Sequence, residues 1–205
     1  MPLEPCTDPS PAAWLTATEV PWRRLVDMGP AGFAAYARLR FIPDPQHPGQ
    51  CENDVDVDGE LPSEHARLQM ALAVLGRHTG TPDEVYYCIW DGWGWSWRGR
   101  RADVRVGVTA TGELDFAARS YFLVRGTLSD FDGWEIEGAT PSRPGGSVPA
   151  PAFVWPADHA WCVANDVDPH YAGIGGSAAA IAQLLETPGL DVVRADPAAE
   201  QPAYR

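Results

Sequence analysis

The chain of 205 residues contains no lysine, so every one of its 15 basic residues is an arginine. It also lacks an apolar run approaching the roughly 18 residues that a membrane helix requires, which predicts that no segment spans a membrane. Three catalytic signatures are missing: the Gly-x-Ser-x-Gly elbow, the His-Glu-x-x-His zinc motif, and a cysteine with an evident histidine partner. These absences lower the expectation of an enzyme without excluding one.

The four cysteines form no Cys-x-x-Cys pair, and the N-terminus has neither the basic start nor the apolar stretch of a secretory signal. We therefore expect reduced thiols and a cytoplasmic protein. The net charge of −13 disfavours nucleic acid and anionic membranes as partners. It would suit a protein partner that is itself basic.

Short β-branched and aromatic runs lie between a few helical segments, a pattern typical of an α+β fold. We expect a central antiparallel or mixed sheet of about five to seven strands, flanked by helices that lie on one side. The clearest elements are a strand over residues 85–90 and helices over residues 63–77 and 178–186. Ser63 and Ser177 are suited to cap the two helices at their N-termini.

The ends of the chain differ in composition from its middle. Residues 1–12 are rich in proline and are expected to be loose. Residues 13–196 are expected to form a single α+β domain. Residues 197–205 are expected to be a disordered tail.

An acidic segment, residues 52–60 (ENDVDVDGE), places carboxylates at alternate positions before a glycine. Asp54, Asp56 and Asp58 match the first ligands of a calcium loop, but the position that needs a bidentate glutamate is His65. We interpret the segment as a solvated acidic turn, with a weak divalent-ion site as the alternative. We expect no bound metal and no cofactor.

The tetrapeptide NDVD recurs at residues 165–168, directly after a hydrophobic strand and before a histidine. Carboxylates at the end of a strand are typical of active sites, so Asp166, Asp168 and His170 are candidate catalytic residues. A turn-forming or capping role for the two aspartates is the alternative. The catalytic hypothesis requires that these side chains line one concave pocket.

A glycine-rich stretch, Gly173-x-Gly175-x-x-Ala178, formally fits the dinucleotide fingerprint. Too few residues follow it to complete a doubly wound fold. We interpret it as a tight turn before a helix. Gly175, Gly176 and Ser177 could hold an anion with their backbone amides.

Aromatic and cationic residues alternate in one stretch of the chain. The set comprises Trp93, Trp95, Trp97, Arg98, Arg100 and Arg101. An extended chain would place the three indoles on one face. That face could belong to the core, contact a protein partner or stack nucleic-acid bases, and the acidic charge of the whole chain disfavours the last.

Four stretches carry a resemblance to a family of uncharacterised cytosolic proteins of high-GC Gram-positive bacteria. They are residues 37–45 (ARLRFIPDP), 89–94 (IWDGWG), 155–168 (WPADHAWCVANDVD) and 175–185 (GGSAAAIAQLL). The resemblance implies no catalytic residue. In its small, acidic, Trp-rich and α+β character the chain is also similar to immunity proteins of bacterial toxin systems, including the SMI1/KNR4-like superfamily.

Three functions follow as hypotheses. The first is a non-enzymatic acidic binding protein, immunity-like, that recognises a protein partner with an aromatic anchor and acidic loops. The second is a hydrolase or metal-dependent enzyme with a carboxylate and histidine site near residues 165–170. The third is a nucleotide or anion sensor at the glycine stretch of residues 173–177.

Overall fold

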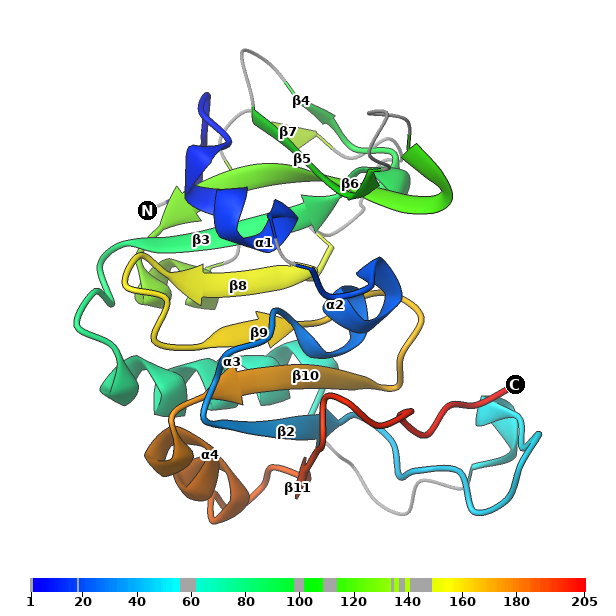
Figure 1. The fold of residues 1–205 in the computed structure, drawn as a ribbon. Coiled ribbons are helices and arrows are strands. Elements are labelled where there is room, and N and C mark those ends of the chain that lie inside the picture. The colour runs from blue at the N-terminus through cyan, green and yellow to red at the C-terminus, as the bar shows by residue number, and fades with distance from the viewer. Residues whose placement is uncertain are drawn as a thin grey trace.

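A computed structural model supplies the fold (Figure 1). The structure describes residues 2–17, 19–55, 62–97, 102–108, 114–133, 135–136, 139–140 and 149–205.

One open antiparallel sheet of nine strands forms the centre of the molecule (Figure 1). Eight of the strands follow one another across the sheet in the order β1 (Glu4–Pro5), β6 (Leu114–Gly126), β3 (Val85–Trp90), β8 (Phe153–Pro156), β9 (Cys162–Ala164), β10 (Tyr171–Gly176), β2 (Ala35–Arg40) and β11 (Val192–Arg194). The ninth strand, β5 (Ala102–Val108), also pairs with β6. A separate two-stranded ribbon joins β4 (Ser96–Trp97) to β7 (Ala139–Thr140).

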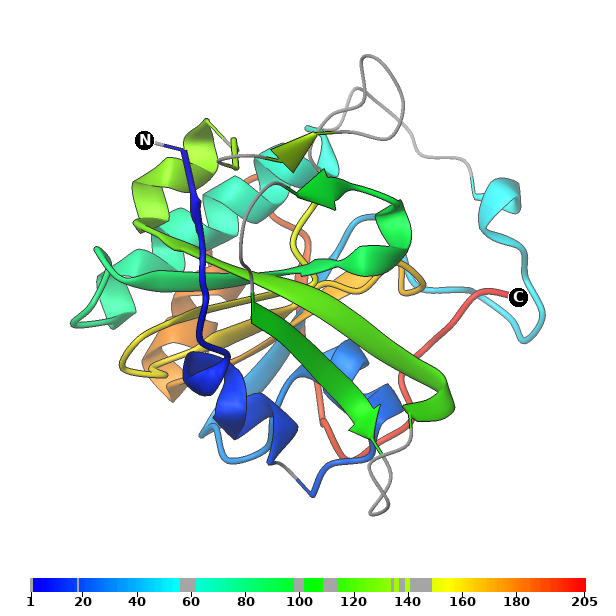
Figure 2. The same ribbon diagram turned by 90° about the horizontal axis from the view of Figure 1, so that it is seen from above.

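Helices cover both faces of the sheet, as Figure 2 shows from above. On one face lie α3 (Glu64–Leu75) and α4 (Ala178–Leu185), and on the other lie α1 (Ala13–Thr16) and α2 (Trp22–Met28). Short 3-10 turns complete the described elements: Ser10–Ala12, Glu52–Asp54 (η2), Gly76–His78, Asp91–Trp93 (η4) and Leu128–Asp132.

The central strand β3 shows why two helical layers are needed. Val85, Tyr87 and Ile89 belong to the core under α3 and α4, whereas Tyr86 and Cys88 belong to the core on the opposite face. A strand that buries both of its faces must be covered on both sides. The α+β class and the antiparallel pairing are confirmed, but the sheet is wider than expected and its helices are not confined to one side.

Both ends of the chain pack against the body. Leu3 is buried, and β1 pairs with β6, although the N-terminal residues were expected to be loose. The expected disordered tail instead crosses the surface: the Tyr204 hydroxyl donates to the carbonyl of Pro43, and the amide of Arg205 donates to the carbonyl of Gln50 at 3.0 Å. Arg24 of α2 donates to the carbonyl of Ala198 at 2.6 Å.

Within the described ranges, no helix is both long enough and apolar enough to cross a bilayer.

Candidate functional site

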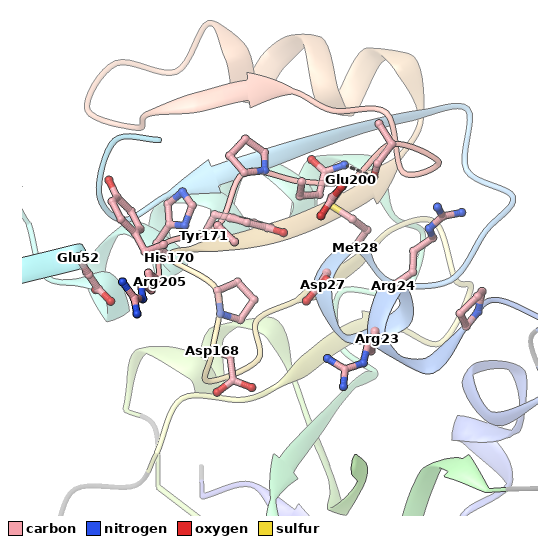
Figure 3. A pocket seen from close by; sticks show the side chains of 17 residues that line it. Arg23, Arg24, Asp27, Met28, Glu52, Asp168, His170, Tyr171, Glu200 and Arg205 are labelled. Atoms are coloured by element: carbon pink, nitrogen blue, oxygen red, sulfur yellow. Dashed lines mark hydrogen bonds between the residues drawn. The ribbon is translucent and has the colours of Figure 1, made fainter. Parts of the chain in front are cut away.

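A cavity of about 750 Å³ lies between helix α2, residues 168–171 and the C-terminal tail (Figure 3). Its size is within the range of small-molecule and side-chain binding sites. We call it the tail pocket. Its walls include Arg23, Arg24, Asp27, Met28, Glu52, Asp168, Pro169, His170, Tyr171 and residues 199–205.

Glycine in β10 is what allows α2 to form one wall of the tail pocket. A Cβ at Gly173 would lie 2.7 Å from the Cα of Met28 and still closer to the carbonyl oxygen of Asp27. Likewise, a Cβ at Gly175 would meet the ring of Phe33 and would lie 2.9 Å from the ring of Tyr36. These glycines therefore serve the close approach of a helix and a ring to the strand.

The glycine stretch is thus a strand and not the predicted turn. Gly175 and Gly176 lie within β10, where each is paired with β2 and Gly175 also with β9. A strand between two paired neighbours does not gather its amides around one point, so this placement removes the geometric basis of the anion hypothesis. Ser177 caps α4, since its hydroxyl oxygen accepts from the amide of Ala180 at 3.1 Å.

Asp27 projects from α2 into the tail pocket (Figure 3). Its half-buried carboxyl accepts no hydrogen bond within the part of the chain that the structure describes. Burial, together with the charges of Asp166 and Asp168 and against the opposing charge of Arg23, raises the pKa of Asp27 to about 6. A carboxyl with this pKa exchanges protons near neutral pH and lacks a partner for its charged form.

The second NDVD segment divides its two aspartates between two environments. Asp166 is buried, accepts from the Tyr121 hydroxyl at 3.2 Å and lies 3.5 Å from Nε of Arg119. The Asp168 side chain is 77% exposed at the edge of the tail pocket, where Arg119 pairs with it. Asp166 therefore anchors Arg119 from within, and Asp168 is the aspartate of this pair that a ligand can reach.

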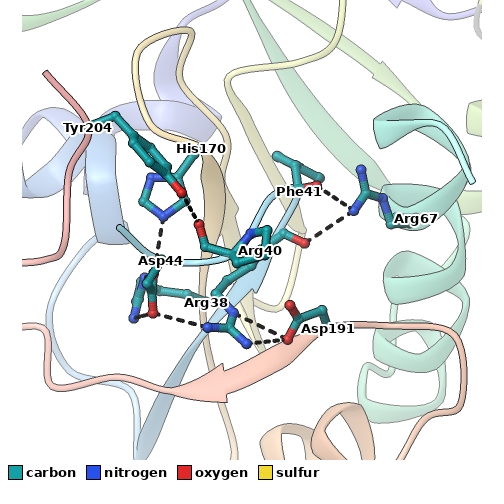
Figure 4. A network of polar contacts seen from close by, with 9 residues as sticks. Arg38, Arg40, Phe41, Asp44, Arg67, His170, Asp191 and Tyr204 are labelled. Atoms are coloured by element: carbon teal, nitrogen blue, oxygen red, sulfur yellow. Dashed lines mark hydrogen bonds and ion pairs between the residues drawn. The ribbon is translucent and has the colours of Figure 1, made fainter. Parts of the chain in front are cut away.

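His170 belongs to a charged network beneath the tail (Figure 4). Its side chain is 2% exposed, and its Nε2 lies 3.0 Å from Asp44. Partial burial of Asp44 would raise the pKa of this carboxyl, but hydrogen bonds from Arg38 and His170 and the charges of Arg38 and Arg40 hold the pKa well below its usual range. Arg40 also reaches Asp191 at 2.7 Å.

Tyr171 forms part of the buried side of the tail pocket and points into it (Figure 3). The residue is 3% exposed, yet its hydroxyl has no hydrogen-bond partner in the described ranges. Burial raises the pKa of Tyr171, and the charge of Asp27 raises it further. The hydroxyl is not among the enclosed polar atoms without a partner, so it opens onto the pocket, where a ligand can reach it.

The first acidic segment contributes less than its sequence suggested. Asp54 is exposed in η2, where its carboxylate accepts from the amide of Cys51 at 3.3 Å, whereas Asp56 and Asp58 lie outside the described residues. Glu52 of the same turn does line the tail pocket. Among the side chains that the structure describes, no three of the His, Cys, Asp and Glu type are arranged to hold a metal ion.

The tryptophan stretch is not a continuous strand. Trp93 belongs to η4 and is 47% exposed, and Gly94 then adopts φ 69°. Trp95 is partly exposed, only the backbone of Trp97 is described, and Arg98, Arg100 and Arg101 lie outside the described residues. The predicted alternation over residues 93–97 is therefore wrong for its first two positions.

A row of side-chain contacts connects Trp93 to the tail pocket. The Trp93 and Trp90 rings meet edge to face with centroids 5.7 Å apart. The guanidinium of Arg119 lies 4.8 Å from the centre of the Trp90 ring and pairs with Asp168. These contacts connect an exposed indole to a carboxylate at the edge of the tail pocket.

Sequence reasoning found Asp168 and His170 but missed the other polar groups of the tail pocket. Asp27 lies between apolar residues of α2, and an isolated acidic residue in such a segment was the one feature of the sequence that could have indicated a polar site there. Tyr171 reads as an ordinary aromatic residue of a strand. Residues 199–205 gave no signal, because they show neither helical nor strand periodicity.

Comparison with protein-family models, with curated proteins and with solved structures finds no match.

Asp27 provides a pH-dependent prediction. Its pKa in the folded protein is raised to about 6 from an ordinary 3.8, so the native state holds the proton more tightly and stability falls as pH rises through this interval. Two pKa units correspond to about 3 kcal/mol, and solvent screening of the partly exposed group reduces this to roughly 1–2 kcal/mol. We expect Asp27→Asn to raise the free energy of unfolding by that amount near pH 8.

The gain should shrink toward zero near pH 4, where Asp27 is already neutral. Urea unfolding of the variant and the parent at both pH values measures the difference. The same substitution at the exposed Asp83 is the control. An equal gain at both pH values would show that ionisation of Asp27 does not destabilise the folded protein.

Proposed function

We propose that this chain is a non-enzymatic binding protein that recognises a positively charged protein partner through the surface running from Trp93 to the tail pocket. The observation that carries the proposal is the row of contacts from the exposed indole through Trp90 and Arg119 to Asp168. It sets an aromatic anchor beside a pocket with unsatisfied polar groups. Interfaces commonly concentrate their binding energy in such anchors.

Charge supports the same proposal. The net charge of −13 attracts basic proteins over distances near the Debye length and accelerates their association. Complementary charge also selects between partners more than it adds affinity. An immunity-like role, in which an acidic protein covers a basic partner, is the form of the proposal that agrees with the resemblance described above.

A cytoplasmic place of action is part of the proposal. All four cysteines are free thiols, and Cys6, Cys88 and Cys162 are buried. Burial raises the pKa of the Cys6 thiol to about 11, which keeps it in the unreactive protonated form. Free thiols of this kind suit a reducing compartment.

A second candidate function is the carboxylate and histidine enzyme of the sequence analysis. Asp168 and His170 both line the tail pocket, and the pKa of Asp27 near 6 is suited to proton transfer. His170 is already hydrogen-bonded to Asp44, and no serine, threonine or cysteine is among the described residues that line the pocket. We therefore rank binding above catalysis.

Affinity capture tests the proposed function. The full chain is immobilised and exposed to lysate of the native host at low and moderate salt, in parallel with Trp93→Ala. Loss of an anchoring indole should reduce the captured partner at least about tenfold. The control is Arg125→Ala, an exposed residue of β6 at the far end of β3 from η4.

The proposal requires both a captured basic protein and its loss with Trp93→Ala. A protein that is captured equally by parent and variant would contradict the proposed surface. Capture of nothing at either salt concentration would contradict recognition of a partner.

A further inference from the structure

Two polar groups of the tail pocket have no protein partner in the described ranges. They are the hydroxyl of Tyr171, in a residue that is nine-tenths buried, and the carboxyl of Asp27. Neither polar atom is sealed off from the cavity, so both are open to a ligand that enters it. The ligand must donate hydrogen bonds, because a carboxylate can only accept them.

The described charged side chains that line the tail pocket leave an excess of one negative charge: four are acidic and three basic, namely Asp27, Glu52, Asp168 and Glu200 against Arg23, Arg24 and Arg205. The charges of Asp166 and Asp168 also act on Asp27. Arg119 is already engaged with both Asp166 and Asp168. Arg23 opposes the excess from α2, but it lies against the ring of Trp22 at 5.0 Å and is exposed to solvent. A positive group between Asp27 and Asp168 would restore the balance.

The shape of the tail pocket favours an organic cation over a bare ion. No described trio of acidic, histidine or cysteine side chains is arranged to hold a metal ion. The cavity of about 750 Å³ also exceeds the needs of a single ion. Apolar surface from Met28, Pro169, Pro202 and Ala203 lines it, which suits the aliphatic stem that carries a guanidinium or ammonium group.

We propose that the tail pocket binds an organic cation, a guanidinium or primary ammonium group on an aliphatic stem, with Asp27 and Asp168 accepting its hydrogen bonds and Tyr171 adding a hydroxyl contact. The inference rests on the proposed function, since the cation can be an arginine or lysine side chain of the partner. A small free amine offers the same chemistry, and the experiment below separates the two sources.

The test compares ligands that differ in charge and little else. Isothermal titration calorimetry measures binding of N-acetyl-arginine amide and of its neutral analogue N-acetyl-citrulline amide to the full chain at low salt. The arginine compound should bind at least about tenfold more tightly, because citrulline offers no charge to the carboxylates. Equal affinities, or no measurable binding of the arginine compound, would overturn the inference.

Variants locate the site. Asp27→Asn and Asp168→Asn should each weaken the arginine compound about tenfold or more, and Tyr171→Phe should weaken it about threefold. Asp191→Asn, on the opposite side of the Arg40 guanidinium from Asp44, should leave the affinity unchanged. Asp27→Asn is expected to be at least as stable as the parent, so loss of binding in that variant cannot be attributed to unfolding. Unchanged affinity in both aspartate variants would contradict the proposed site.

The two proposals can fail separately. If capture depends on Trp93 but persists in Asp27→Asn, and the arginine compound does not bind, the proposed partner recognition stands and the proposed cation site is wrong. The same calorimetric titration with agmatine, a free amine with a guanidinium group on an aliphatic stem, separates the sources. If agmatine binds, Asp27→Asn abolishes that binding and no protein is captured, the cation site stands and its ligand is a small amine.

Discussion

Replacing Gly173 by alanine is expected to lower the free energy of unfolding by about 3 kcal/mol, at the upper end of what overpacking costs. The added Cβ would meet the backbone of α2 at Asp27 and Met28, and backbone cannot move aside as the end of a flexible side chain can. Helix α2 would have to shift away from β10. Because α2 forms one wall of the tail pocket, binding of the arginine compound should also be lost.

Gly133→Ala is the matched control. Gly133 has φ −87°, and among the described atoms beyond its chain neighbours the nearest to a Cβ there would be the carbonyl oxygen of Asp130 at 4.0 Å, so its substitution should change stability by less than about 0.5 kcal/mol. Urea unfolding and calorimetric titration measure both effects. A Gly173→Ala variant with the stability and affinity of the parent would contradict the close packing of α2 on the sheet.

Asp44→Ala is expected to destabilise the protein by about 3 kcal/mol. Asp44 accepts from both terminal nitrogens of Arg38, a buried residue of β2, and also from Arg40 and His170. Removing it leaves a buried guanidinium without its main counter-charge, which costs about 3–5 kcal/mol in fully buried pairs. Asp44 is one quarter exposed, so we take the lower end.

The control for Asp44 is Asp191→Ala. Asp191 pairs with Arg40 but is 43% exposed, and exposed ion pairs contribute about 0–1 kcal/mol. Thermal unfolding should therefore show a fall of roughly 6–12 °C for Asp44→Ala and little change for Asp191→Ala. Equal decreases in melting temperature for the two variants would mean that the destabilisation does not come from leaving the buried Arg38 without its counter-charge.

Elements with long periodic patterns could be predicted from the sequence. The strand over residues 85–90 and the helices beginning after Ser63 and Ser177 are confirmed. Their apolar residues and capping serines act locally, so a single sequence contains the signal. The α+β class followed from the same segments.

The width of the sheet could not be predicted in this way. Strands β1, β9 and β11 have two or three residues each; the hydrophobic run before residue 165 did indicate β9, and the apolar residues near 192 indicated β11, but β1 is too short for a recognisable alternation. Their place depends on pairing with strands that are distant in sequence. The same holds for the tail, whose residues 198, 204 and 205 are held by single hydrogen bonds to remote residues.

The candidate site was predicted in part. Asp168 and His170 do line a cavity, but Asp166 is directed to Tyr121 and Arg119 instead. The glycine stretch matched a nucleotide fingerprint, yet its glycines are explained by the backbone of α2 and the rings of Phe33 and Tyr36. A sequence motif shows which residues are small or acidic, but the groups that pack against them in the fold determine whether those residues bind a ligand or only allow close packing.

The central claim is that the tail pocket holds a positively charged group, and a nuclear magnetic resonance titration of isotope-labelled protein with N-acetyl-arginine amide tests it most directly. We predict saturable shift changes confined to α2, residues 168–171 and residues 199–205, with none of comparable size from the citrulline analogue. Changes that spread over unrelated surfaces, or that both compounds produce equally, would contradict the account.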